Sequence, residues 1–269
     1  MEAQVIRPAA VAGMFYPGGP LDLADDVRRL LDRATVPALP ARPKALVVPH
    51  AGYRYSGSVA ASAYASLAPW AGGIRRVVLL GPCHRVAVRG LAASGAAAFT
   101  TPLGLVPLDQ AAIGTALNLP QVILHDAAHA DEHSLEVQLP FLQAVLDDFT
   151  LVPFAVGYAT PDEVAELLEL LWDGSETLFV ISSDLSHYHA YTDAQRRDRR
   201  TADDILHLRQ LIDHDQACGA TPINGLIELA RRRNLEPHLI DLRNSGDTAG
   251  DKSRVVGYAS FAFTEPAHG

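Results

Sequence analysis

Short apolar runs alternate along this chain with segments in which apolar residues recur at helical spacing. The runs predict strands at 44–48, 76–80, 86–94, 101–108, 150–156, 177–182, 237–242 and 254–263. The periodic segments predict helices at 21–31, 58–67, 109–117, 134–146 with a kink at Pro140, 161–171, 193–213 and 221–233. Strands that alternate with helices predict an α/β fold with a central, mostly parallel mixed sheet flanked by helices. The last two strands have no helix between them and are expected to pair antiparallel.

Length and composition bound the organisation of the chain. Its 269 residues, 48% of them hydrophobic, can bury a full core. The Pro-rich stretch 36–43 is the one linker candidate, and it leads directly into a predicted core strand, so we predict a single domain over 1–269. The formal charge of −9, without a basic face, argues against nucleic acid or an anionic membrane as the main partner.

The sequence also carries expectations about location. The N-terminal residues lack the basic and apolar regions of a signal peptide. No apolar stretch approaches the roughly 18 residues that span a bilayer. Two cysteines give no disulfide framework, which fits a reducing compartment. We therefore expect a cytoplasmic protein that does not enter the membrane.

Four predicted strands end in residues that can bind metal or move protons. Each begins as an apolar run, and the four stretches are 45–50, 77–84, 178–187 and 239–247. In a largely parallel sheet the carboxyl ends of the strands meet at one edge, where ligands bind. Side-by-side strands would bring histidines and carboxylates into one pocket. The pattern therefore predicts a metal-centred site.

The histidines at the strand ends are the first candidates. His50 and His84 each follow an apolar run, beside Pro or Gly residues that allow a sharp turn, and we predict that both are metal ligands. The alternative for each is a ring whose nitrogens are satisfied by the loop backbone. His133 precedes a predicted helix, where it either lies among acidic residues that complement the helix dipole or polarises a substrate oxygen at the pocket edge.

Carboxylates complete the candidate set. Asp184 and His187 stand three residues apart at a strand exit, where Asp184 can orient the imidazole of His187 as an acid/base; the alternative is a capped turn with a surface histidine. Asp247 is the predicted third metal ligand, with Asp251 in reserve, although a purely turn-forming role fits this Gly-rich loop as well.

The cysteines and the absence of three known motifs bear on other kinds of catalytic chemistry. Cys83 and Cys218 have no companion ligand in their own segments and are expected to be small buried apolar residues. The chain has no glycine-rich dinucleotide fingerprint, no phosphate loop and no Gly-x-Ser-x-Gly elbow. Nucleotide-dependent and serine-hydrolase chemistry therefore lack their usual signs.

Taken together in their order along the chain, these motifs resemble the Memo family, known in bacteria and archaea as AmmeMemoRadiSam system protein B. The similarity runs nearly end to end. The matching stretches are Ala-Gly-Met-Phe-Tyr-Pro at 12–17, Pro-His-Ala-Gly-Tyr at 49–53 with Ser-Gly at 56–57, Gly-Pro-Cys-His at 81–84, Thr-Pro-Leu-Gly at 101–104, Asp-Glu-His-Ser at 131–134 with Glu136, Ser-Ser-Asp-Leu-Ser-His at 182–187 and Asn-Ser-Gly-Asp at 244–247.

The resemblance extends to the fold and activity of class III extradiol dioxygenases of the LigB type. It implies His50 and His84 as ligands of Fe(II), His187 as the acid/base near Asp184, and His133 on the pocket wall. Asp247 would complete a two-histidine, one-carboxylate set, which favours Fe(II), with zinc or copper as alternatives. It further implies a small-molecule substrate and, as partners, the radical SAM and AMMECR1-like proteins of the same system.

Two other functions stay open. The same pocket would serve a non-catalytic protein that binds metal or peptide, as has been proposed for animal relatives. It would also serve a zinc hydrolase, in which metal-bound water attacks the substrate. Metal identity separates the oxygenase from the hydrolase, because redox chemistry with oxygen needs iron.

Overall fold

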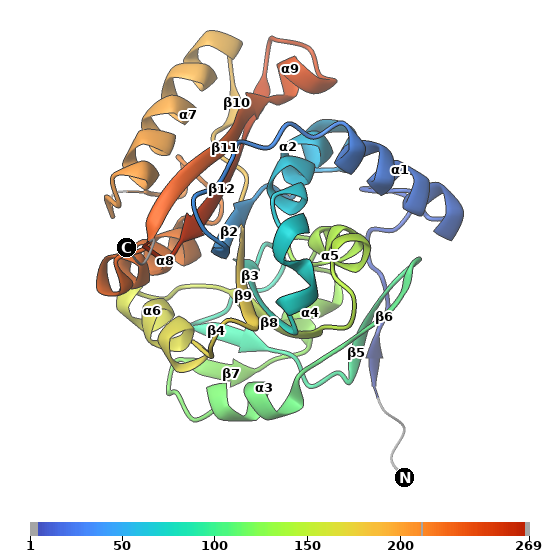
Figure 1. Cartoon of the computed structure of the whole chain (residues 1–269), viewed down its shortest axis with the longest axis vertical. Coiled ribbons are helices and arrows are strands. Elements are labelled where there is room, and N and C mark those ends of the chain that lie inside the picture. Colours follow the sequence, from blue (N-terminus) through green and yellow to red (C-terminus); the bar gives the residue numbers. More distant parts are fainter. Residues whose placement is uncertain (1–4, 211, 267–269) are drawn as a thin grey trace.

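The centre of the computed structural model, which describes residues 5–210 and 212–266, is a nine-stranded mixed sheet (Figure 1). Eight of its strands follow the spatial order β10-β12-β2-β9-β3-β8-β4-β7, and β11 also pairs with β12. In that order the bounds are His187–His189, Val255–Thr264, Pro43–Val48, Thr177–Ser182, Arg76–Pro82, Thr150–Val156, Leu91–Ala93 and Val122–Leu124, with β11 at Glu236–Asn244.

The inner strands of this sheet confirm the predicted parallel centre. Strands β2, β9, β3 and β8 run parallel to one another, and nearly all of their residues are buried. Continuous burial is expected where helices cover both faces of a parallel sheet. Strand β12 is antiparallel to both β2 and β11, as predicted for the C-terminal pair.

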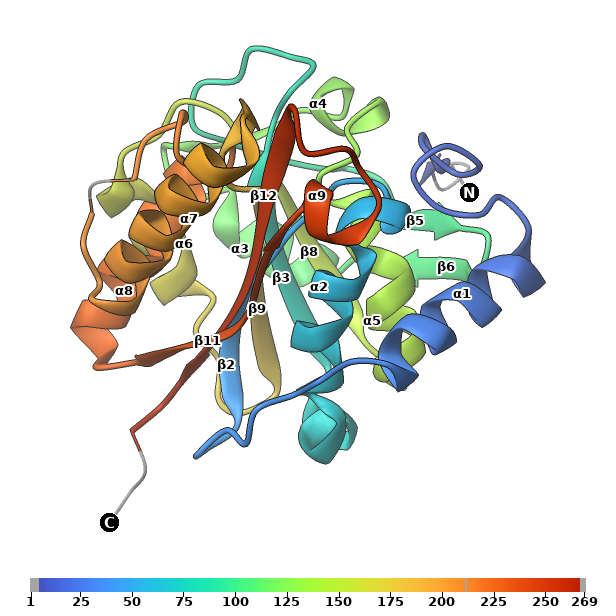
Figure 2. The ribbon, with the colours of Figure 1, turned by 90° about the horizontal axis from the view of Figure 1, so that it is seen from above.

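Helices cover both faces of the sheet (Figure 2). On one side lie α1 (Pro20–Asp32), α2 (Tyr53–Ala65) and α5 (Leu139–Val145). On the other lie α6 (Pro161–Leu170), α7 (Tyr191–Leu206) and α8 (Ala220–Arg233). The small residues of α2 permit close packing, and a Cβ on Gly57 would lie 3.0 Å from the Leu30 side chain of α1. The predicted fold class is therefore confirmed.

Shorter elements complete the described structure. Strands β1, β5 and β6 form a second, three-stranded sheet. The remaining pieces are short helices that connect the strands. The bounds are Ile6–Arg7 for β1, Ala98–Thr101 for β5, Gly104–Pro107 for β6, Gln110–Ala116 for α3, Ala127–Ala130 for α4, Ser245–Thr248 for α9, and Ala68–Gly73 and Glu136–Gln138 for the 3₁₀ helices η1 and η2.

Several predicted elements differ from the structure. The helix expected over 58–67 begins at Tyr53, and the helix expected over 193–213 ends at Leu206. The helix expected over 134–146 is divided into η2 and α5, so Pro140 lies in the first turn of α5, where proline is tolerated, and not at a kink. The strand expected over 101–108 is the end of β5, a turn, and β6, because Gly104 adopts a positive φ of 125°. Of the strand expected over 86–94, only β4 is regular.

Among residues 5–210 and 212–266, no helix combines the length and the apolar character that crossing a bilayer requires.

Candidate metal centre

The two strand-end histidines come from strands that flank β9. Strand β2 ends at Val48, and β3 ends at Pro82; both run parallel to β9, which lies between them. His50 and His84 therefore leave the same edge of the sheet, two residues beyond their strands. His50 is buried, whereas the side chain of His84 keeps 31% exposure and is accessible from solvent.

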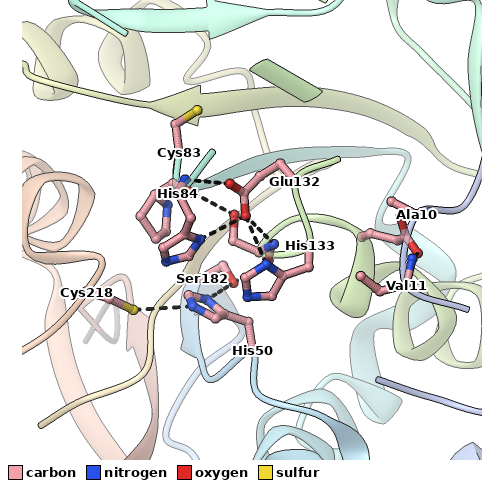
Figure 3. A network of polar contacts seen from close by, with 12 residues as sticks. Ala10, Val11, His50, Cys83, His84, Glu132, His133, Ser182 and Cys218 are labelled. Atoms are coloured by element: carbon pink, nitrogen blue, oxygen red, sulfur yellow. Dashed lines mark hydrogen bonds and ion pairs between the residues drawn. The ribbon is translucent and has the colours of Figure 1, made fainter. Parts of the chain in front are cut away.

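A third histidine joins them from the segment between α4 and η2. One ligand atom each from His50, His84 and His133 lies within 4.8 Å of the other two (Figure 3). The ring centroid of His133 lies 5.5 Å from that of His50 and 4.9 Å from that of His84. These separations allow the three rings to turn toward one metal ion. His133, predicted as a pocket residue, thus becomes a candidate ligand.

The hydrogen bonds of Ser182 determine which nitrogen of His50 can bind metal. The Ser182 hydroxyl donates its proton to the Ser134 carbonyl at 2.6 Å and accepts from the Gln138 side chain at 2.8 Å. A hydroxyl has one proton, so it accepts from His50 Nδ1, which lies 2.9 Å away. Neutral His50 therefore carries its lone pair on Nε2. Burial, followed by repulsion from His84 and His133, lowers the pKa of His50 and keeps the ring neutral.

Glu132 fixes His84 in the same way. Its Oε1 accepts from His84 Nδ1 at 2.9 Å and from the Ser134 backbone at 2.9 Å, while its Oε2 accepts from the His84 backbone at 2.5 Å. Burial alone would raise the pKa of Glu132, but the hydrogen bonds and charge of His84 lower it to about 2. A carboxylate on the far nitrogen orients metal-binding histidines and raises their basicity. His84 Nε2 is therefore also free for a ligand.

His133 has an unsatisfied ring nitrogen. Its Nδ1 is buried without a hydrogen bond and lies 3.4 Å from Glu132 Oε1. Burial lowers the pKa of His133 to about 4, although the charge of Glu132 acts in the opposite direction. The ring is thus neutral at pH 7 and can donate a lone pair to a metal.

A thiol contacts the same cluster. Cys218 precedes α8, and its Sγ lies 3.3 Å from His50 Nε2 (Figure 3). The Asp184 backbone donates to Sγ at 3.3 Å. Burial, and then the charge of Asp184, raise the pKa of Cys218 to about 12, so the metal-free thiol is protonated. Cys218 has no companion ligand in its own segment, as predicted, but the fold brings His50 to it from 168 residues away.

Asp184 and His187 line the same cavity but are not paired. The Asp184 carboxylate accepts from the backbone of His50 at 2.7 Å and of Ala51 at 3.3 Å. Burial raises the pKa of Asp184 to about 7, against the effect of these two bonds. Within the described residues it forms no hydrogen bond or ion pair with His187, so it anchors the His50 loop and does not orient the imidazole. Burial lowers the pKa of His187, which opens β10.

The structure does not bring Asp247 to the histidines. Its Oδ1 accepts from the Tyr191 hydroxyl at 2.5 Å, and its Oδ2 accepts from the Asn244 backbone at 3.0 Å. It closes the capping box of α9 and lines a separate cavity of about 40 Å³. Asp251 lines the histidine cavity, but its carboxylate accepts from the Ser253 backbone at 2.7 Å and hydroxyl at 2.5 Å. Neither aspartate belongs to the close group.

The histidines open into a cavity of about 880 Å³. This volume suits a small organic ligand. The imidazoles, Cys218 and Asp184 supply polar groups on its wall, and four aromatic side chains supply apolar surface. The aromatic residues are Phe15, Tyr55, Tyr188 and Tyr258.

Comparison with known proteins identifies the family. The family model described as Memo-like protein matches residues 7–262. This chain belongs to the Memo family. A MEMO1 family protein of Ignicoccus hospitalis is 37% identical, over 97% of this chain and 100% of its own length. Relatives of the same name from Sulfolobus acidocaldarius and Aquifex aeolicus are 35% and 34% identical, each over 96% of this chain and 99% of their own.

A solved structure shares the fold. The crystal structure of an uncharacterized protein from Escherichia coli K12 superposes with a TM-score of 0.54 at 15% sequence identity. The similarity covers 82% of this chain and 99% of that protein. At this sequence identity the similarity shows only that the two proteins share a fold.

Sequence reasoning missed three members of the centre. Ser182 ends the predicted strand 177–182, and Glu132 lies in the acidic stretch before the predicted helix 134–146; neither position indicates a contact with a histidine. Both carry hydrogen bonds that fix histidine tautomers. For Glu132, the one indication in the sequence is its position next to His133. Cys218 gave no such signal, because its partner His50 is distant in sequence.

Proposed function

We propose that this Memo family protein is a metal-dependent redox enzyme acting on a small molecule, with Fe(II) as the working metal. One observation carries the proposal. His50 and His84 each have Nδ1 held by an outer hydrogen bond, which directs the lone pair of His50 Nε2 toward the Cys218 thiol and leaves His84 Nε2 for a ligand, beside His133 at an open cavity large enough for a substrate. Imidazoles oriented by outer hydrogen bonds are the usual preparation for metal binding.

The residues present fit a divalent ion. His50 and His84 would bind it through Nε2, and His133 would supply a third nitrogen from the same close group. The orphaned Nδ1 of His133 is costly without a ligand or proton acceptor. Cys218 is the reserve donor, because its sulfur already contacts His50 Nε2. When bound, the metal would supply redox chemistry and polarise a substrate oxygen.

His187 is the proposed acid/base. It lines the cavity without belonging to the close group of ligands. Because burial lowers its pKa, the imidazole is neutral at pH 7 and is ready to accept a proton from a substrate hydroxyl. Phe15, whose ring centroid lies 4.7 Å from that of His133, packs against one side of the centre.

A zinc hydrolase is the second candidate, and the third histidine favours it. Three histidines with an open position form a known catalytic zinc set. The adjacent thiol would also suit zinc or Cu(I), since soft sulfur ligands select these ions. Metal identity therefore needs a functional test, because zinc outcompetes Fe(II) at many nitrogen sites regardless of the working metal.

The test compares metals under anaerobic loading. Protein carrying Fe(II), Zn(II) or Cu(I) is mixed with a panel of catechols and other small reductants, and oxygen uptake and product are followed. We expect turnover with Fe(II) alone. The His50→Ala variant should lose metal and turnover, while His125→Ala, which changes a histidine of a different cavity, should keep both.

Two results would overturn the redox proposal. Equal rates for zinc-loaded and iron-loaded protein would replace it with hydrolysis. Retention of metal by His50→Ala, at the affinity of the wild type, would remove the proposed centre itself.

A further inference from the structure

An arginine and a tyrosine meet on the wall of the histidine cavity. Arg254 immediately precedes β12, and Tyr188 lies in β10, which pairs with the start of β12. The pairing is irregular at Tyr188, whose φ of 62° is unusual for a residue with a large side chain. This conformation places the Tyr188 ring centroid 5.2 Å from the Arg254 guanidinium carbon. Backbone strain of this kind is common at ligand sites.

The Arg254 guanidinium forms no ion pair with the part of the chain that the structure describes. Within residues 5–210 and 212–266, no carboxylate oxygen lies within 4.0 Å of its nitrogens, and its side chain forms no hydrogen bond. The cation–π contact with Tyr188 takes up none of the guanidinium N–H groups. An arginine with free N–H groups is suited to a bidentate contact with a carboxylate.

The other walls favour a flat apolar body. Phe15, Tyr55 and Tyr258 line the cavity together with Tyr188, so an aromatic ring entering it would meet aromatic surface on several sides. Two acidic residues, Asp251 and Asp184, also line the cavity. Ser253 donates two hydrogen bonds to Oδ1 of Asp251, and backbone amides donate to Oδ1 of Asp184. Among the described residues that line the cavity, Arg254 is the one arginine or lysine, so it is the group that can offer a positive charge and N–H donors to an anionic ligand.

We propose that the cavity selects a small aromatic carboxylate, whose carboxylate binds Arg254 and whose ring packs against the tyrosines. An aromatic carboxylate would be the substrate of the metal-dependent enzyme proposed above, so its role in catalysis rests on that proposed function. The binding step needs no metal. Recognition by Arg254 can therefore be measured separately from redox activity.

The probe is 4-fluorobenzoate, followed by fluorine NMR titration with metal-free and zinc-loaded protein. We expect Arg254→Gln to weaken binding about fivefold or more, as is typical when a charged hydrogen-bond donor is lost. Arg254→Lys should bind with intermediate affinity, because it keeps the charge but not the planar fork. Arg89→Gln removes an exposed arginine of a different cavity and should leave the affinity unchanged. Neutral 4-fluoroanisole should bind equally to all four proteins.

The outcomes separate the two proposals. Equal affinity of wild type and Arg254→Gln for 4-fluorobenzoate, no binding to the wild type, or competition by acetate as strong as by benzoate would each overturn the aromatic carboxylate. Arg254-dependent binding in protein that fails to hold iron or consume oxygen would keep the binding inference and remove the proposed redox function.

Discussion

Replacing Glu132 with glutamine should weaken metal binding at the centre while leaving every histidine in place. The carboxylate receives three donors: His84 Nδ1, the His84 backbone and the Ser134 backbone. Glutamine offers one carbonyl oxygen and one amide group that only donates. If the amide faces His84 Nδ1, the imidazole moves its proton to Nε2 and blocks the metal-binding atom. If it faces the His84 backbone, a buried N–H loses its acceptor.

The expected losses of folding stability and of zinc affinity follow from these hydrogen bonds. An orphaned buried donor costs about 1–3 kcal/mol of folding stability. Loss of an outer partner of a metal-binding histidine weakens metal affinity about 10–100-fold. At about 1.4 kcal/mol per tenfold, that loss corresponds to roughly 1.4–2.8 kcal/mol of binding free energy. We therefore expect the Zn(II) dissociation constant of Glu132→Gln to rise by that factor.

The assay uses competition with a chromophoric chelator for Zn(II), together with urea unfolding of metal-free protein. Glu136→Gln is the matched control. Glu136 is equally buried and accepts from Arg7, Tyr16 and two backbone amides, but it forms no hydrogen bond or ion pair with His50, His84 or His133. It should lose stability and keep metal affinity within about threefold. Glu163→Gln, in the exposed capping box of α6, gives the baseline effect of a surface glutamate-to-glutamine change on zinc affinity and stability.

Wild-type zinc affinity in Glu132→Gln would refute the reasoning. It would mean that the orientation and tautomer of His84 do not depend on the carboxylate. A similar loss of affinity in Glu136→Gln would also refute it, because the effect would then come from general loosening of the segment that carries His133.

The other predictions concern the remaining cavity residues. His133→Ala should weaken Zn(II) binding at least about tenfold. Asp247→Ala should leave Zn(II) binding unchanged, because Asp247 is bonded to Tyr191 and to the α9 cap. In the same chelator titration, a larger loss of affinity for Asp247→Ala than for His133→Ala would contradict this assignment. His187→Ala should keep metal affinity but lose turnover in oxygen uptake, and loss of metal matching that of His50→Ala would assign His187 as a ligand. The raised pKa of Asp184, about 7, means that the folded protein retains a proton which the unfolded chain releases near pH 4. The contribution of Asp184 to the free energy of unfolding should therefore fall as pH rises from about 4 to 7. In urea titrations of metal-free protein, the Asp184→Asn variant should lack this fall. Identical pH slopes for the variant and the wild type would exclude the effect.

The strand pattern was readable from sequence because it reflects local chemistry. The buried runs that became β2, β3, β8 and β9 are continuous apolar stretches, and such stretches form central parallel strands wherever helices cover both faces. The positions of His50 and His84 followed from the same rule, since both lie just beyond a strand end. Helix 134–146 was divided because proline tolerates only the first turn.

Which residues complete the centre was decided by tertiary structure. Cys218 meets His50 across 168 residues, and Glu132 meets His84 across 48, so no local pattern joins either pair. Asp247 had the right residue type and a strand-end position, yet its carboxylate satisfies the backbone of α9. Sequence determines which side chains can bind a metal or a proton. The packing of strands and loops determines which of those side chains keep a free lone pair, because every buried donor nearby competes for it.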